Sequence, residues 1–181
     1  MWKDRLKTAL EQSSQSTDRY FQIATVSAGG NPSNRTVVFR GFAEDSNGIL
    51  ISTDARSSKM ADLKNNYIAS LCWYFESTRE QFRLVCDVEI ISDTDHPIVE
   101  AQWKDHSEAS RKMFYQPAPG SEYSELSDER DMNLNHPAEH FAIVVCKPKE
   151  VDYLSLKTQP HTREIWTKDE KGEWNGKRVW A

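Results

Sequence analysis

Between residues 34 and 89, the chain holds the side chains best suited to binding a phosphate group. Arg35 and Arg40 enclose an apolar run, and strand alternation places Arg35 with Val37 and Phe39 on one face and Arg40 with Thr36 and Val38 on the other. A following turn supplies one cation and several hydroxyls: Lys59, Ser52, Thr53, Ser57 and Ser58. Cations and hydroxyls together suit several phosphate oxygens better than a lone lysine does. The pattern therefore predicts a phosphate site.

A third segment adds an amide, Gln81, among apolar strand residues. The order of the three segments resembles that of the pyridoxine/pyridoxamine 5'-phosphate oxidase family, in particular a divergent branch of FMN-binding proteins. The family patterns R-x-V-L-L-K, S-R-K and R-Q-V-R-V-x-G are similar to residues 35–40, 57–59 and 80–83, and R-x-H-D-R is similar to residues 159–163. The resemblance implies a six-stranded antiparallel split barrel of Greek-key type, with FMN in a groove between the two subunits of a homodimer.

The same resemblance implies roles for individual residues. Two cations, Lys59 and Arg163, and the amide of Gln81 are expected to contact FMN, and Gln81 should lie near the isoalloxazine ring. The other expected FMN contacts are Arg35, Thr36, Val37, Val38, Phe39, Arg40, Ser52, Thr53 and Ser58. Candidate substrate-binding residues are Trp103, Arg111, Gln159 and His161, and His161 and Arg163 are the candidates for a catalytic role.

Departures from the family pattern bear on the substrate. Gln159 stands where the oxidases place an arginine over their substrate, Ser58 replaces the arginine of S-R-K, and Glu80 replaces the arginine of R-Q. The remaining cations can still neutralise one phosphate of charge near −2. The residues therefore predict FMN binding, and they favour it over oxidation of pyridoxamine phosphate. Three functions remain open: such an oxidase, another FMN oxidoreductase of a small molecule, and a non-catalytic flavin-binding protein.

Composition favours one globular domain spanning residues 1–181. The chain is 38% hydrophobic and 28% charged, and its net charge of −5 gives no reason to expect nucleic acid or an anionic membrane as partner. No N-terminal signal core or membrane span is present in the sequence, and the three scattered cysteines are typical of buried thiols, so we expect a cytoplasmic protein. His136 and His140 have no third ligand nearby, and no metal site is expected.

The predicted elements are mainly β with peripheral helices, an α+β class. Helices are expected from Trp2 to Gln12, after Ser57 or Ser58 through Asn66, from Asp95 through Trp103, and from Ser107 to Phe114. Turns are expected at residues 28–32 and 44–48, and a polar loop at 121–135. The expected strands are residues 21–27, 35–40, 49–51, 67–75, 81–91, 141–146, 150–156, 164–168 and 173–180. Antiparallel strands joined by short turns favour a closed barrel.

Overall fold

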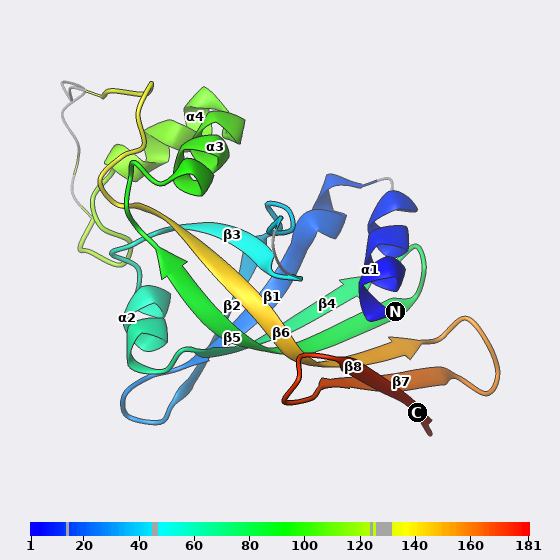
Figure 1. Cartoon of the computed structure of the whole chain (residues 1–181). Coiled ribbons are helices and arrows are strands. Elements are labelled where there is room, and N and C mark those ends of the chain that lie inside the picture. Colours follow the sequence, from blue (N-terminus) through cyan, green and yellow to red (C-terminus); the bar gives the residue numbers. More distant parts are fainter. Residues whose placement is uncertain (14, 45–46, 124, 126–131) are drawn as a thin grey trace.

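The computed structural model describes residues 1–13, 15–44, 47–123, 125 and 132–181. Eight antiparallel strands are surrounded by peripheral helices (Figure 1). The helices are α1 Trp2–Glu11, α2 Ser58–Asn65, α3 Pro97–Asp105 and α4 Glu108–Lys112, with short 3-10 turns η1 Ser16–Arg19 and η2 Met113–Tyr115. The strands are β1 Tyr20–Val26, β2 Pro32–Val38, β3 Ile49–Asp54, β4 Ile68–Phe75, β5 Glu80–Ile91, β6 Phe141–Ser155, β7 Thr162–Lys168 and β8 Trp174–Val179.

The barrel is built from β1 to β6, in the order β2-β1-β4-β5-β6-β3. The long strand β6 shares one edge between two partners: its first half pairs with β3, and its second half pairs with β7. No ladder joins β2 to β3 in the part of the chain that the structure describes, although Arg40 N donates to Leu50 O at 2.9 Å. The barrel is thus split between β2 and β3, and β7 with β8 extends from it as a hairpin (Figure 1).

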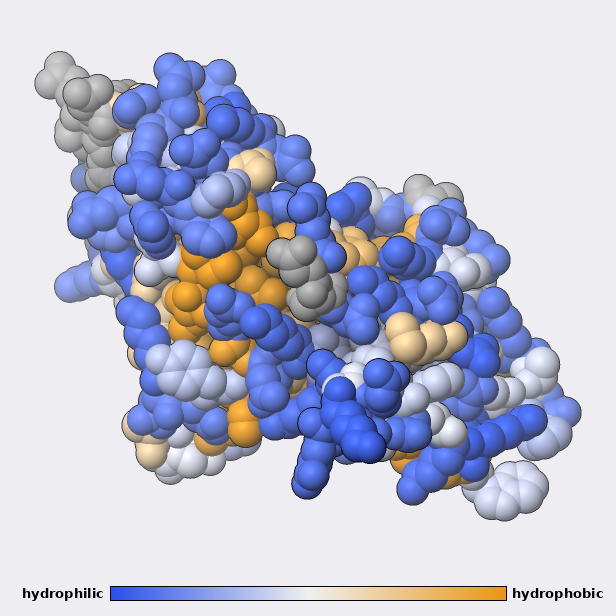
Figure 2. Space-filling model, in the orientation of Figure 1, coloured by the Kyte–Doolittle hydropathy of each residue, from blue (hydrophilic) through white to orange (hydrophobic). Residues whose placement is uncertain are grey.

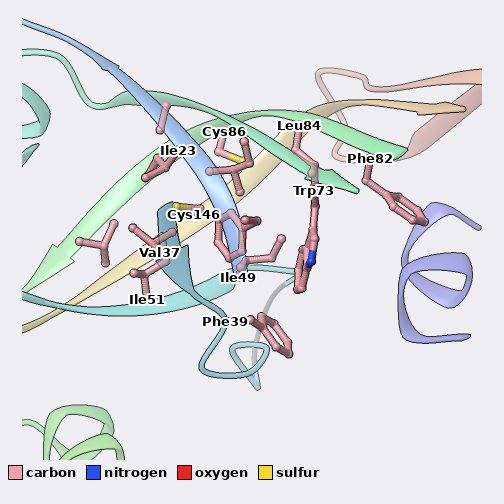
Figure 3. Packing of buried hydrophobic residues seen from close by; sticks show 14 of the residues in the cluster. Ile23, Val37, Phe39, Ile49, Ile51, Trp73, Phe82, Leu84, Cys86 and Cys146 are labelled. Atoms are coloured by element: carbon pink, nitrogen blue, oxygen red, sulfur yellow. The ribbon is translucent and has the colours of Figure 1, made fainter. Parts of the chain in front are cut away.

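Alternating apolar residues explain why these strands close around a core. Burial in β4 and β5 follows a period of two, as expected for strands with one face in the core. Figure 3 shows the interior, where Trp73 lies near Phe39 and side chains from β1, β3, β5 and β6 fill the remaining space. The ring centroids of Trp73 and Phe39 are 5.1 Å apart. Helix α1 contributes Trp2 and Leu6 to the same cluster, and both are fully buried.

A second apolar cluster lies on the outer side of β3 and β6, under α3. It contains Trp103, whose ring centroid is 5.0 Å from that of Phe141. Beside it, a groove of about 700 Å³ is lined by α3 and by β3, β5 and β6, and Figure 2 shows apolar surface in this region. Its apolar lining includes Leu50, Ile91 and Val145. No helix among the described residues is long and apolar enough to cross a membrane.

The main difference from the predicted elements concerns strand continuity. The six strands of the predicted barrel are present, and the two further strands predicted at residues 164–168 and 173–180 are β7 and β8. Residues 141–146 and 150–156 were predicted as two strands, whereas β6 runs unbroken through Pro148, because the register with β5 shifts near Val85 and absorbs the irregularity. The predicted turn at 44–48 and loop at 121–135 fall partly on residues 45–46, 124 and 126–131, outside the described residues.

Candidate functional site

The first group of candidate site residues surrounds Lys59 in the first turn of α2. Its Nζ donates to Thr53 Oγ1 at 2.8 Å and to Ser57 Oγ at 3.0 Å. Ser57 is the N-cap residue of α2, and its hydroxyl donates to Asp54 O at 2.7 Å. The end of β3 and the start of α2 therefore place one cation and two hydroxyls together beside the positive end of a helix.

Arg35 on β2 belongs to the same region. Its NH1 donates to Thr25 Oγ1 at 2.7 Å, and the Thr25 hydroxyl donates to Asp62 Oδ2 at 2.6 Å. Arg35 NH2 lies 3.7 Å from Asp62 Oδ2, and the two side chains are 20% and 12% exposed. Asp62 is on α2, three residues after Lys59, so the same helix directs a cation to Thr53 of β3 and an anion to Thr25 of β1 and Arg35 of β2.

The charge of this Lys59 group is unbalanced. Burial lowers the pKa of Lys59, and the nearby Arg35 lowers it further. Arg35 and Lys59 stand against the carboxylate of Asp62, and the other nearby carboxylate, Asp54, is paired with Arg56, so one positive charge is left. Lys59 takes part in none of the ion pairs found among the described residues. A partly desolvated cation beside another cation, with hydroxyls at hand, is a donor set that fits the phosphate of FMN.

Arg40 and Ser52 lie in a different group. Arg40 Nε donates to Ser52 Oγ at 3.1 Å, and Ser52 Oγ lies 2.8 Å from Nε2 of His106, just after α3. Because side chains alternate along β3, Ser52 and Thr53 point to opposite faces of the strand. The structure therefore divides the single phosphate cluster expected from the sequence into two: the Lys59 group on one face of β3, and an Arg40 group of Arg40, Ser52 and His106 on the other.

The remaining predicted FMN contacts differ in whether their side chains are accessible to a ligand. Val37 and Phe39 are buried in the core, so only their backbone atoms remain available to a ligand. Thr36 is exposed and Val38 is half-buried on the opposite face. Ser58 is exposed at the first residue of α2.

Gln81 and Arg163 lie on the outer face of the sheet. Gln81 is half-buried and pairs across the strands with Tyr74 and Leu154, and Leu154 pairs with Arg163. Arg163 Nε and NH2 donate to the two carboxylate oxygens of Asp152 at 3.1 and 2.8 Å, which raises the pKa of the guanidinium. Directly opposed residues share a face of the sheet, so the side chains of Gln81 and Arg163 point away from the barrel interior.

Arg35 lies on the inner face instead. It pairs with Ile23, which pairs with Leu71, which pairs with Leu84, and all three partners are buried core residues. Arg35 and Gln81 therefore project from opposite faces of the same sheet.

The predicted substrate residues are distributed over two regions. Gln159 and His161 lie in the loop before β7, where Gln159 is exposed and His161 Nδ1 is 2.9 Å from Thr158 O. The expectation that Trp103 contacts a substrate needs correction, because its side chain is fully buried and its Nε1 donates to Leu134 O at 3.0 Å. Arg111 is half-buried, and its NH1 donates to the same carbonyl at 2.9 Å, so both residues hold the segment around Leu134.

Three residues of these groups were not predicted as site residues: Thr25, Asp62 and His106. Thr25 carried a signal, since it is a polar residue at a position of β1 where alternation from Phe21 and Ile23 predicts burial. No sequence signal identified Asp62 or His106, because their contacts depend on how α2 and α3 dock on the strands. Among the described residues, no group of three or more His, Cys, Asp or Glu could hold a metal ion.

Comparison with known proteins relates this geometry to a family. Residues 1–92 match the family model described as pyridoxamine 5'-phosphate oxidase, FMN-binding domain. The chain is 39% identical over 166 residues to pyridoxine/pyridoxamine 5'-phosphate oxidase 2 of Arabidopsis thaliana, covering 87% of this chain and 84% of that protein. The chain belongs to this family. FMN is the family's cofactor, and the predictions of an FMN-binding protein and of a split barrel are confirmed.

Solved structures of related proteins agree with this assignment. A pyridoxamine 5'-phosphate oxidase-related, FMN-binding protein from Nostoc punctiforme superposes with a TM-score of 0.93 at 35% identity, covering 99% of this chain and 97% of that one. PhzG from Burkholderia lata gives a TM-score of 0.77 at 17% identity, covering 99% and 90% of the two chains, and shares the fold. The FMN-binding fold of the family therefore extends over almost the whole chain.

Proposed function

We propose that this protein is an FMN-dependent oxidoreductase of a small molecule and that the Lys59 group holds the FMN phosphate. The observation that carries the proposal is the convergence of Lys59 Nζ, Thr53 Oγ1 and Ser57 Oγ within hydrogen-bond distance, next to Arg35. Charge-assisted hydrogen bonds from these donors would neutralise a phosphate of charge near −2. FMN, when bound, supplies the redox chemistry, and the protein supplies binding and orientation.

The flavin ring is proposed to lie against Gln81 and Arg163, contributed by a second copy of the chain. Arg35 faces the barrel interior while Gln81 faces outward, so one copy does not present both residues to the same side of its sheet. A homodimer with a shared site removes this conflict. Arg163 would then exchange part of its contact with Asp152 for the flavin.

The outer face of β1 and β4 supports such a dimer. It exposes Tyr74, which pairs with Gln81, at 47% and Tyr20 at 46%, and Ile68 is 43% exposed farther along β4. Adjoining exposed apolar residues commonly mark a surface that is covered by a partner. We propose that the second copy packs on this face.

Substrate choice is proposed to differ from that of an ordinary pyridoxamine phosphate oxidase. Gln159 carries no charge, so it lacks the ion pair that the family pattern provides there, while His161 remains beside it with its Nε2 3.4 Å from Gln159 Nε2. The name of the Arabidopsis relative favours a second candidate, true oxidation of pyridoxine or pyridoxamine 5'-phosphate. The third candidate function is flavin binding without catalysis.

A cytoplasmic location is part of the proposal. The cysteines of the described structure are free, and burial raises the pKa of the Cys146 thiol to about 12. Unpaired thiols are typical of reducing compartments.

An absorbance spectrum of the purified protein, with mass analysis of the released chromophore, tests FMN binding. Turnover with oxygen and pyridoxamine phosphate would identify an oxidase, and bleaching by NAD(P)H would identify a reductase. A colourless protein that does not take up added FMN would refute the proposal.

A further inference from the structure

Asp152 on β6 holds two arginines on the outer face of the sheet. Its Oδ1 accepts a hydrogen bond from Arg163 Nε at 3.1 Å. Its Oδ2 accepts from Arg163 NH2 at 2.8 Å and also from NH2 of Arg83, the residue directly opposite on β5. The side chain of Asp152 is only 12% exposed, whereas those of Arg163 and Arg83 are 31% and 47% exposed. One largely buried carboxylate therefore anchors two cations.

The two ion pairs keep Asp152 charged. Burial raises the pKa of its carboxyl, but the hydrogen bonds and charges of Arg163 and Arg83 outweigh burial, and the pKa is lowered. The contact with Asp152 in turn raises the pKa of the Arg163 guanidinium. Two arginines against one carboxylate leave this group with one positive charge.

Gln81 and Arg163 lie in one row across the sheet, with Leu154 between them. Neighbouring strands are about 4.8 Å apart, so the two polar side chains stand roughly 10 Å apart, on either side of an alkyl group. The amide of Gln81 and NH1 of Arg163 make no hydrogen bond in the part of the chain that the structure describes. This row therefore offers an apolar surface with hydrogen-bonding groups at both ends, which suits a flat ring with polar edges.

We propose that Asp152 is a positioning residue that anchors Arg163 through Nε and so aims its two terminal nitrogens at the flavin ring bound by the second copy of the chain. The terminal nitrogens of a guanidinium bind two acceptors at once. An arginine that is already held loses less rotamer freedom when the ring binds, which favours binding. The inference rests on the proposed function in that the ring is taken to lie against Gln81 and Arg163.

Arg83 makes this arrangement possible, because it shares Oδ2 of Asp152 with Arg163. When NH2 of Arg163 turns to the ring, Oδ2 keeps a donor in Arg83, and Oδ1 keeps the bond from Nε. The largely buried carboxylate is then never left without a partner, which would be costly. Arg83 thus replaces the contact that Arg163 gives up.

Fluorescence titration of the flavin-free full chain with FMN and with riboflavin tests the inference. Asp152→Asn should weaken the binding of both ligands by about three- to tenfold, because the lost contact is to the ring that they share. Asp152→Glu keeps a carboxylate and should retain most of the affinity. Arg163→Met should lose at least as much as Asp152→Asn, and combining the two changes should add little further loss.

A second measurement reads the position of Arg163 directly. In ¹⁵N NMR of the FMN-loaded full chain, the Nε–H of Arg163 should be protected from exchange with water, and Asp152→Asn should remove this protection. Arg83→Met should keep the protection but weaken flavin binding by about two- to fivefold, since Oδ2 then has no donor except Arg163. Asp87→Asn is the matched control, because it breaks an ion pair between the same two strands, 2.7 Å long, with Lys149.

Three outcomes are decisive. Unchanged affinity for both ligands in Asp152→Asn, with only a lower melting temperature, would overturn the inference and leave Asp152 as a structural residue. Additive losses for Asp152→Asn and Arg163→Met would show that Asp152 does not act through Arg163. A wild-type chain that binds neither FMN nor riboflavin would instead refute the proposed function, and the inference with it.

Discussion

Replacing Lys59 with alanine tests whether the Lys59 group recognises the phosphate of FMN. The change removes the ammonium that contacts Thr53 and Ser57 and leaves Arg35 as the only cation of the group. Met60 and Leu63 on the buried side of α2 remain, so the helix should keep its place. The effect should therefore fall on the ligand rather than on the fold.

A magnitude follows from the donors that are lost. A hydrogen bond to a charged group contributes about 1.5 to 3 kcal/mol, which corresponds to roughly 10- to 150-fold in the dissociation constant. Lys59 is already partly removed from water when no phosphate is bound, and its replacement relieves that desolvation cost. The lower part of the range allows for this relief. We expect FMN binding to weaken by at least about tenfold.

Fluorescence titration of the apoprotein with FMN and with riboflavin provides the assay. Riboflavin lacks the phosphate, so Lys59→Ala should leave its affinity unchanged while that of FMN falls. Lys64→Ala is the matched control, since Lys64 is an exposed lysine on the same helix. An FMN dissociation constant within twofold of wild type in Lys59→Ala would refute the role of Lys59, and equal losses for FMN and riboflavin would indicate damage to the whole pocket.

Four further predictions concern pH, the ring site, assembly and substrate. FMN affinity should fall as pH rises through the lowered pKa of Lys59, because the neutral amine does not pair with phosphate, and Lys59→Arg should keep its affinity at high pH; a loss of equal size in both proteins would contradict this. Gln81→Leu should shift the flavin spectrum or redox potential with only a modest loss of FMN binding, and a native spectrum and potential would make Gln81 structural. Sedimentation should report twice the 20.9 kDa chain mass and Tyr74→Glu should reduce it, whereas a monomer that holds FMN tightly would argue against the shared site. Pyridoxamine 5'-phosphate should be turned over about 30- to 1000-fold more slowly than by an ordinary oxidase, and Gln159→Arg should raise the rate; ordinary wild-type turnover would show that the substitution is compensated.

Much of the fold could be predicted because the apolar pattern is strong. Alternation in residues 67–75 and 81–91 identified β4 and β5 within a residue at each end, and the pattern of Trp2, Leu6 and Ala9 identified α1. The continuity of β6 was missed because Pro148 interrupts the pattern, although a proline is tolerated where the ladder register shifts. Local signals therefore located the strands but not every junction between them.

The site was less predictable because its contacts depend on pairing between distant segments. Lys59 and Thr53 are six residues apart and were foreseen, whereas Asp62 meets Thr25 across 37 residues and His106 meets Ser52 across 54. No periodicity in the sequence records which helix will dock over which strand. Such partners become visible only when the tertiary structure is known.

The division of the expected phosphate cluster shows how far a simple rule reaches. Alternation alone places Arg35 and Arg40 on opposite faces, and it does the same for the adjacent residues Ser52 and Thr53. The structure follows this rule: Arg35 and Thr53 belong with Lys59, and Arg40 belongs with Ser52. A single phosphate would have required both arginines on one side of the strands. The two polar groups are therefore separated by β3, and only the Lys59 group combines a lysine, an arginine and two hydroxyls on one side of the strand.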